Sequence, residues 1–210
     1  MIIHNIPREE RNLRRVLTKA EELLKRGEVI YFPTDTLPAL LAWATLDEAV
    51  LKVFQIKRRP LDKPLPLAVK DPQEIKRYIR VEDNTLRKLS DFIPGPLTIV
   101  ASLNKGVSLP AFLVKNGEAA FRVPDYKPLL LLLERVAPLT LTSANLHNER
   151  VLFHLDDALD VLGGEVKYYF VDYHHRYQGI PSSVVRLGDE VMIIRAGVVS
   201  EEEIRERLNG

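Results

Sequence analysis

The chain of 210 residues contains no cysteine, and this absence excludes several kinds of site. There can be no disulfide framework, no thiolate nucleophile and no zinc or iron–sulfur site built on Cys ligands. Long hydrophobic runs are also missing: the longest leucine run is Leu129–Leu133, far short of the roughly 20 residues that cross a bilayer. Residues 1–10 lack the basic-then-apolar order of a signal peptide. We therefore expect a cytoplasmic protein with no membrane partner.

The chain also has no large excess of positive or negative charge. Thirty Lys and Arg residues face 29 Asp and Glu residues, which gives a formal net charge of +1. This balance argues against bulk coating of nucleic acid but leaves a local basic patch open. Hydrophobic residues make up 46% of the chain, enough to build a packed core.

Helix-like segments recur along the chain. Apolar residues at helical spacing predict a helix opened by Pro7 and ended by Gly27. Thr45 and Glu48 have capping-box spacing, which predicts a helix starting at Thr45. Further helices are expected to start at Asp71-Pro72 and after Ser200.

Strand-like segments alternate with these helices. They are expected at residues 29–32, 65–69, 97–103, 119–123, 139–142, 166–171, 183–186 and 191–196. The interleaving predicts one α/β domain over residues 1–210, a twisted mixed sheet with flanking helices. Because Pro64, Pro66 and Pro96 cannot donate to a ladder, we expect the strands that carry them to be edge strands.

Several well-known motifs are absent. The chain has no Gly-x-x-x-x-Gly-Lys-Ser/Thr phosphate loop, no Gly-x-Gly-x-x-Gly fingerprint, no Gly-x-Ser-x-Gly elbow and no His-Glu-x-x-His. Adjacent His174 and His175 would point to opposite faces of a strand, so they could not share a metal ion. The five histidines are therefore interpreted as solvated or hydrogen-bonded side chains.

Polar residues follow apolar strands at two places. Pro33-Thr34-Asp35-Thr36 comes directly after one predicted strand, and Ser143-Ala144-Asn145 ends another. Hydroxyl, carboxylate and amide groups at strand ends can hold a small polar ligand. Turn or helix-cap chemistry explains the same residues equally well.

Cations gather at two kinds of place. Residues 57–63 hold four cations and one acid where a helix ends, a pattern that suits either a polyphosphate or a solvated face. Arg122 and Arg195 are embedded in apolar strands, where an unpaired charge costs several kcal/mol. Each is expected to have an anionic partner, either a ligand or a carboxylate of the protein.

Seven short motifs in this order resemble the YrdC-like family, which includes L-threonylcarbamoyladenylate synthases. The resemblance runs from about residue 28 to 199. It rests on Pro33-Thr34-Asp35-Thr36, Lys57-x-Arg59-Pro60 with Lys63-Pro64-Leu65, Pro94-Gly95-Pro96-Leu97-Thr98, Arg122-Val123-Pro124, Ser143-Ala144-Asn145, Ser182-Ser183-Val184-Val185 and Arg195-x-Gly197. It implies a short, single-domain form of a twisted α/β fold with a basic concave surface.

The resemblance also implies a reaction. L-Threonine, bicarbonate and ATP would give threonylcarbamoyl-AMP and diphosphate, and a separate transferase would move the group to tRNA to make N6-threonylcarbamoyladenosine. The substrate supplies the nucleophile, so no catalytic side chain is expected and the protein contributes positioning and charge stabilisation. Magnesium would come with ATP, held by phosphate oxygens and not by side chains.

The resemblance also assigns site residues, position by position. Thr36, Arg122 and Ser182 correspond to the threonine site. The positions that correspond to the ATP site are Lys57, Arg59, Lys63, Ser143, Asn145 and Arg195.

The sequence departs from the family pattern at several places. Leu37-Pro38-Ala39 stands where the family has an aromatic residue and then glycine, His147-Asn148 stands for Ser-Gly, and Arg186 for an aspartate. Two other functions stay open: a related enzyme that makes a different acyl or carbamoyl adenylate, and a protein of the same fold that binds double-stranded RNA or tRNA.

Overall fold

The structure is a computed structural model that describes residues 1–188 and 190–210. Its α-helices are α1 (Glu10–Lys25), α2 (Asp47–Lys57), α3 (Pro72–Tyr78), α4 (Asp83–Lys88), α5 (Lys127–Leu133), α6 (Leu155–Leu162) and α7 (Glu201–Asn209). Two short 3₁₀ segments are η1 (Ser90–Phe92) and η2 (Ala111–Leu113). Its strands are β1 (Ile2–Asn5), β2 (Ile30–Phe32), β3 (Ala39–Leu41), β4 (Leu67–Ala68), β5 (Leu97–Ser102), β6 (Glu118–Arg122), β7 (Leu139–Thr140), β8 (Thr142–Ser143), β9 (Tyr168–Val171), β10 (Ser183–Arg186) and β11 (Met192–Arg195).

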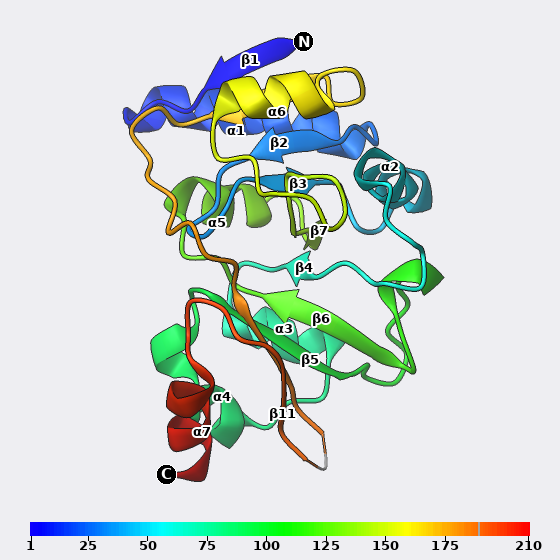
Figure 1. Ribbon diagram of the computed structural model, residues 1–210, viewed down its shortest axis with the longest axis vertical. Helices are drawn as coiled ribbons and strands as arrows, with labels where there is room; N and C mark the ends of the chain where they lie inside the picture. Colours follow the sequence, from blue (N-terminus) through cyan, green and yellow to red (C-terminus); the bar gives the residue numbers. More distant parts are fainter. Residues whose placement is uncertain (189) are drawn as a thin grey trace.

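The strands form two hydrogen-bonded sheets, where the sequence led us to expect one. One sheet has the order β1-β9-β2-β3-β8 and the other β11-β10-β5-β6-β4-β7. Both are mixed: β2 pairs parallel with β9 and antiparallel with β3, and β5 pairs parallel with β10 and antiparallel with β6. The first sheet lies toward the N-terminus and the second toward the C-terminus (Figure 1). The expected α/β class with mixed pairing is confirmed.

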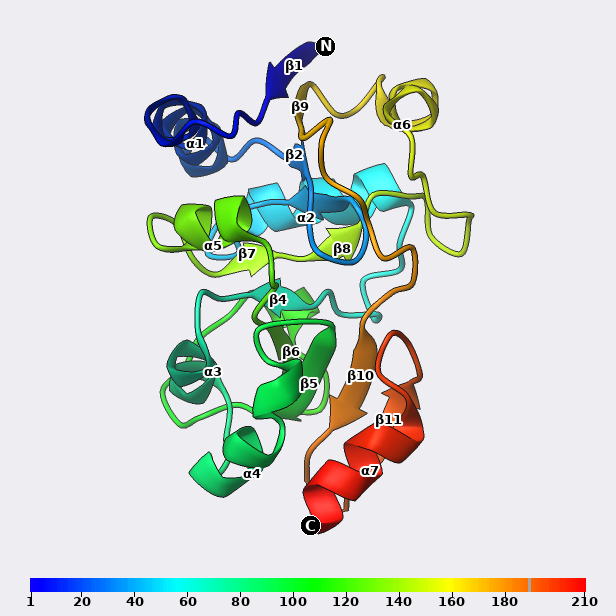
Figure 2. The same ribbon diagram turned by 90° about the vertical axis from the view of Figure 1, so that its left-hand side faces the viewer.

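The central strands of the first sheet are buried on both faces. Every residue of β2 and β3 is buried. Ile30 and Phe32 pack with Leu17 and Leu24 of α1, whereas Tyr31 faces the other way and packs with Val53 of α2. This alternation follows from the two-residue period of a strand. Figure 2 shows α1 and α5 on one side of the sheet and α6 on the other.

Two helix starts differ from the sequence expectation. Helix α1 begins at Glu10, not Pro7, because the Ile6 N–H still donates to Val171 O (2.8 Å) and prolongs the pairing of β1 with β9. Helix α2 begins at Asp47 with Leu46 at its N-cap and no side-chain cap, so the capping box at Thr45 is wrong. Asp47 and Glu48 instead place negative charge in the first turn of α2, which favours a helix N-terminus.

The proline prediction is also wrong. Strand β4 lies between β6 and β7, and β5 lies between β10 and β6, so neither is an edge strand. Pro66 and Pro96 stand one residue before these strands and contribute carbonyls: Pro66 O accepts from Leu141 N and Pro96 O from Ser183 N. A proline before the first residue of a strand removes no donor from the ladder.

Helices α3 and α7 begin where the sequence predicts. Asp71 caps α3 by accepting from Glu74 N, and Ser200 and Glu203 form a reciprocal capping box on α7. Gly27 has a φ of +75° directly after α1 and lets the chain turn there. Within the part of the chain that the structure describes, no helix combines the length and the apolar character that crossing a membrane requires.

Candidate active site

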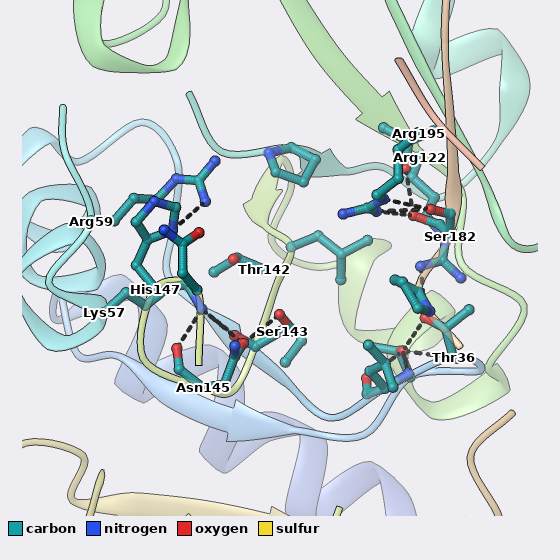
Figure 3. Close-up of a pocket in the computed structure, with 18 residues that line it drawn as sticks. Thr36, Lys57, Arg59, Arg122, Thr142, Ser143, Asn145, His147, Ser182 and Arg195 are labelled. Atoms are coloured by element: carbon teal, nitrogen blue, oxygen red, sulfur yellow. Dashed lines mark hydrogen bonds between the residues drawn. The ribbon is translucent and has the colours of Figure 1, made fainter. Parts of the chain in front are cut away.

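A cavity of about 250 Å³ receives side chains from both sheets. Five of its polar side chains lie at or next to the ends of strands: Thr36 follows β2, Arg122 ends β6, Ser143 ends β8, Ser182 precedes β10 and Arg195 ends β11. The other lining residues are Thr34, Leu37, Ala39, Lys57, Arg59, Pro66, Thr98, Leu141, Thr142, Asn145, His147, Asn148 and Pro181. Figure 3 shows Lys57, Arg59 and His147 on one side of the cavity, with Thr36, Ser182 and Arg195 across from them.

Arg122 is a deeply buried cation of the cavity, with 4% of its surface exposed. Its Nη2 donates to Asp35 Oδ2 (2.6 Å), Nη1 to Thr36 Oγ1 (2.9 Å) and Nε to Gly95 O (2.8 Å). Burial lowers the pKa of Arg122, and the charge of Asp35 opposes this. The anionic partner that the sequence required is therefore a carboxylate of the protein. A guanidinium has five N–H donors, so two remain for a ligand.

Hydroxyl groups surround Arg122. Thr34 Oγ1 accepts from the N–H groups of Thr36 (3.1 Å) and Leu37 (3.2 Å), which fixes the turn after β2. Ser182 Oγ lies 3.0 Å from Thr98 Oγ1. The guanidinium and the threonine and serine hydroxyls thus form a polar end of the cavity that fits a small carboxylate-bearing molecule.

Lys57 holds the loop that carries Ser143 and Asn145. The side chain is 2% exposed, and its Nζ donates to Ser143 O, to Asn145 O (2.6 Å) and to Asn145 Oδ1 (3.3 Å). Burial and then the charge of Arg59 lower the pKa of Lys57 to about 7. A lysine ammonium has three N–H donors, and this loop accepts them all. Lys57 is thus placed to shape the cavity more than to contact a ligand.

Arg59 projects from the loop after α2. Its Nε donates to Lys63 O (2.7 Å) and its Nη2 to Pro64 O (3.1 Å). Burial and the charge of Arg195 lower the pKa of Arg59, with Asp62 opposing. The left-handed Arg58 (φ 50°) ends α2 and begins this loop. Two backbone carbonyls hold the Arg59 guanidinium at the mouth of the cavity.

Arg195 differs from the sequence expectation. It lies at the exposed edge strand β11 and donates through Nε (3.1 Å) and Nη2 (2.8 Å) to Ser182 O. An exposed arginine bonded to a carbonyl does not need an anionic partner, so that argument is wrong for Arg195. Arg195 lines the cavity, and its charge lowers the pKa of both Arg59 and Arg122.

Eight of the nine residues named from the sequence line this cavity, Lys63 being the exception. Lys63 lines an adjoining groove of about 910 Å³, which shares Arg59, Pro66, Thr98, Asn148 and Arg195 with the cavity. Ligand pockets measure roughly 300–1,000 Å³. The cavity alone has the size for an amino acid, and the groove adds the room that a nucleotide needs.

Two lining residues were missed as site residues. Thr98 was seen only as part of a motif, although its hydroxyl lies beside Ser182. His147 was interpreted as an ordinary histidine, yet the loop after Ser143 turns back and places it against Arg59. The signals for it were its position four residues after Ser143 and its place where the family pattern has serine.

Comparisons with known proteins show which family the chain matches. A family model for Sua5, YciO and YrdC proteins, described as "Telomere recombination", matches residues 22–197. The chain belongs to the Sua5/YciO/YrdC family. A Methanocaldococcus jannaschii protein provisionally named threonylcarbamoyl-AMP synthase is 32% identical over 203 residues, which span 96% of this chain and 94% of that protein. Threonylcarbamoyl-AMP synthase of Bacillus subtilis is 29% identical over 192 residues, 90% of this chain but 55% of its own length.

Solved structures of the family agree with the fold. P. abyssi Sua5 complexed with L-threonine superposes with a TM-score of 0.87 at 25% identity, over 99% of this chain and 61% of that one. E. coli YciO superposes with a TM-score of 0.82 at 24% identity, over 97% of this chain and 98% of its own. The chain thus matches nearly the whole of YciO and 61% of the Sua5 chain. The resemblance to YrdC-like proteins is confirmed.

Proposed function

We propose that the protein is a threonylcarbamoyl-AMP synthase that forms threonylcarbamoyl-AMP and diphosphate from L-threonine, bicarbonate and ATP. One observation carries this proposal: a hydroxyl-rich end around Arg122 and a cationic end around Arg59 meet in one cavity. Family membership supports it, since the B. subtilis relative is named for this activity and the M. jannaschii relative provisionally so. The product would serve a separate transferase that modifies tRNA.

At the threonine end, the two free N–H donors of Arg122 would bind the substrate carboxylate. The hydroxyl of Thr36 accepts from this guanidinium, and that of Ser182 accepts from Arg195 Nη2 (3.3 Å). Both hydroxyls line the cavity and would orient the amine and the side chain. The threonine ammonium group and bicarbonate condense to a carbamate, and one water and one proton are released to solvent. The protein needs no nucleophile of its own for this step, because the substrate amine forms the new bond.

At the nucleotide end, Arg59, Arg195 and Lys63 would bind the phosphates, with Ser143 and Asn145 on the loop held by Lys57. A carbamate oxygen then attacks the α-phosphorus and diphosphate leaves, as fixed positive charge stabilises the developing negative charge. Among residues 1–188 and 190–210 no carboxylate lines the cavity, so magnesium would enter with ATP on phosphate oxygens and water. Magnesium would supply charge neutralisation on the phosphates.

The wall formed by Leu37, Pro38 and Ala39 bears on the choice of amino acid. Leu37 and Ala39 line the cavity, and Pro38 O accepts from Ala144 N (2.8 Å), which ties this wall to the Ser143 loop. A stiff apolar wall beside Thr36 suits the methyl group of threonine. Replacing threonine by serine or valine in the assay tests this fit directly, and faster turnover with either would indicate a related enzyme with another substrate.

The test is formation of diphosphate and threonylcarbamoyl-AMP, the latter identified by mass spectrometry, when ATP, threonine and bicarbonate are all present. Omission of any one should abolish the product. An absence of product under conditions in which the B. subtilis synthase is active would refute the proposal.

Arg59→Ala tests the nucleotide end. Two of the five N–H donors of Arg59 bond to backbone carbonyls and a third faces His147, so two are left for a ligand. One charge-assisted hydrogen bond contributes about 1.5–3 kcal/mol. Calorimetry should therefore show the Kd for ATP rising by roughly 10- to 150-fold. The matched control is Arg58→Gln, which removes the neighbouring exposed charge and should leave the Kd nearly unchanged. Equal effects of the two variants would mean that only overall charge matters.

A further inference from the structure

The His147 ring lies between two cations. Its Nδ1 is 3.4 Å from Arg59 Nη1, and its Nε2 is 3.2 Å from Lys63 Nζ. A neutral imidazole has one N–H and one lone pair, whereas arginine and lysine only donate. Only one of the two contacts can therefore be a hydrogen bond. At the other contact an N–H of the ring faces a donor, and neither group has an acceptor there.

The backbone keeps the ring in this place. His147 N donates to Lys57 O (2.8 Å), so the end of α2 and the loop after β8 are tied together. The Asn145 amide donates to Leu146 O (2.9 Å) and Glu149 O (2.8 Å) and closes the loop around the histidine. The crowding of donors thus belongs to the folded loop and not to one mobile side chain.

The charges near His147 are almost all positive. Partial burial and the charges of Arg59, Lys63 and Lys57 lower its pKa. Asp62 is the acid that acts on Arg59, and Glu149 and Arg150 follow on the histidine's own loop, both exposed. Among residues 1–188 and 190–210, ion pairs within 4.0 Å include none with Arg59, Lys63 or Arg195. An anion among these groups would give every donor an acceptor.

We propose that His147 is a further ligand of the polyphosphate in this site and that it takes up one proton from solvent as the anion binds. The identity of the anion as ATP or diphosphate rests on the proposed function. As an imidazolium the ring donates from both nitrogens to phosphate oxygens, while Arg59 and Lys63 donate to the same group. No covalent bond forms or breaks. The serine that the YrdC-like pattern has here could not carry this charge.

Calorimetric titration with inorganic diphosphate tests the proton uptake. Measurements at pH 6, 7 and 8 in two buffers of different ionisation enthalpy give the number of protons taken up. The native protein is compared with His147→Gln, which keeps a polar side chain that does not titrate. The control is His154→Gln, because His154 is exposed, makes no capping bond to α6 and does not line the cavity.

The native protein and His154→Gln should take up more protons than His147→Gln at pH 7. Their Kd should also rise more steeply with pH than that of His147→Gln, by up to about tenfold more per pH unit between the free and bound pKa values of the ring. Diphosphate itself titrates in this range, so the difference between variants is the quantity that counts. Equal proton uptake and equal pH dependence in all three proteins would overturn the proposal.

An NMR titration of the histidine ring protons keeps the proposal testable if His147→Gln folds poorly. The pKa of His147 should lie below its ordinary value in the free protein and rise when diphosphate is added. A resonance that does not respond to diphosphate would refute the proposal. Neither measurement needs turnover, so a failure to make threonylcarbamoyl-AMP would count against the proposed function while leaving this result intact.

Discussion

The buried pair of Arg122 and Asp35 allows a sharp test of how the site is held together. Their side chains are 4% and 7% exposed, and Arg122 Nη2 lies 2.6 Å from Asp35 Oδ2. Asp35→Asn keeps the volume and one acceptor oxygen but removes the negative charge. The guanidinium then stays buried without a counter-charge, so the folded state should lose stability.

The magnitude follows from burial. At an effective dielectric constant near 20, two unit charges about 4 Å apart attract by about 4 kcal/mol. Removing one partner of a buried pair costs about 3–5 kcal/mol. For a chain of this size, 1 kcal/mol shifts Tm by roughly 2–4 °C, so Asp35→Asn should lower Tm by about 6–20 °C.

Urea unfolding followed by circular dichroism measures the free energy directly, and calorimetry measures Tm. The exposed pair of Glu10 and Arg14 is the control: its N–O distance of 2.8 Å is similar, but both side chains are 70% exposed. Glu10→Gln should leave stability unchanged within error, because solvent screens such a pair. If Asp35→Asn were as harmless as Glu10→Gln, the reasoning from burial would be refuted.

Two other positions give clear expectations. Gly197→Ala would place a Cβ 2.2 Å from Pro181 O and 2.6 Å from Ser182 C, so this variant should destabilise the fold and weaken ATP binding through Arg195. The control Gly164→Ala, whose Cβ would have no neighbour within 4 Å, should have neither effect. Equal calorimetric results for the two variants would contradict this reasoning. Because burial and Arg59 lower the pKa of Lys57 from 10.5 to about 7, the unfolded chain binds more protons than the folded one between these values, and stability should rise with pH there. Lys57→Met should remove this rise in urea unfolding at pH 7 and 9, and identical slopes in both proteins would refute the lowered pKa.

Strands and their polar ends were the part of the fold most accessible from sequence. Residues 183–186 form a strand with the expected bounds, and the segment at 97–103 differs from β5 by one residue. Apolar runs closed by hydroxyl-bearing residues are local signals, so they can be recognised without knowledge of the tertiary structure. Eight of the nine residues assigned by the family resemblance line one cavity.

What the sequence missed depends on contacts between distant segments. Strand β1 is stabilised by its pairing with β9, more than 160 residues away, and its local pattern gave no sign of it. The separation into two sheets likewise depends on which strands pair. Lys57 and Arg122 were recognised as site residues, but the carbonyls and the carboxylate that hold them come from other elements. Local composition cannot distinguish a cation that binds a ligand from one that orders a loop.

The two carbonyls that hold Arg59 also affect how tightly an anion can bind. A free arginine side chain samples many rotamers, and fixing it costs about 2 kcal/mol of conformational entropy. Here Lys63 O and Pro64 O restrain the guanidinium in the unliganded protein, so most of this conformational entropy is already lost when the protein folds. Arriving phosphates therefore find a prepositioned charge, and the binding free energy is reduced little by ordering of the side chain.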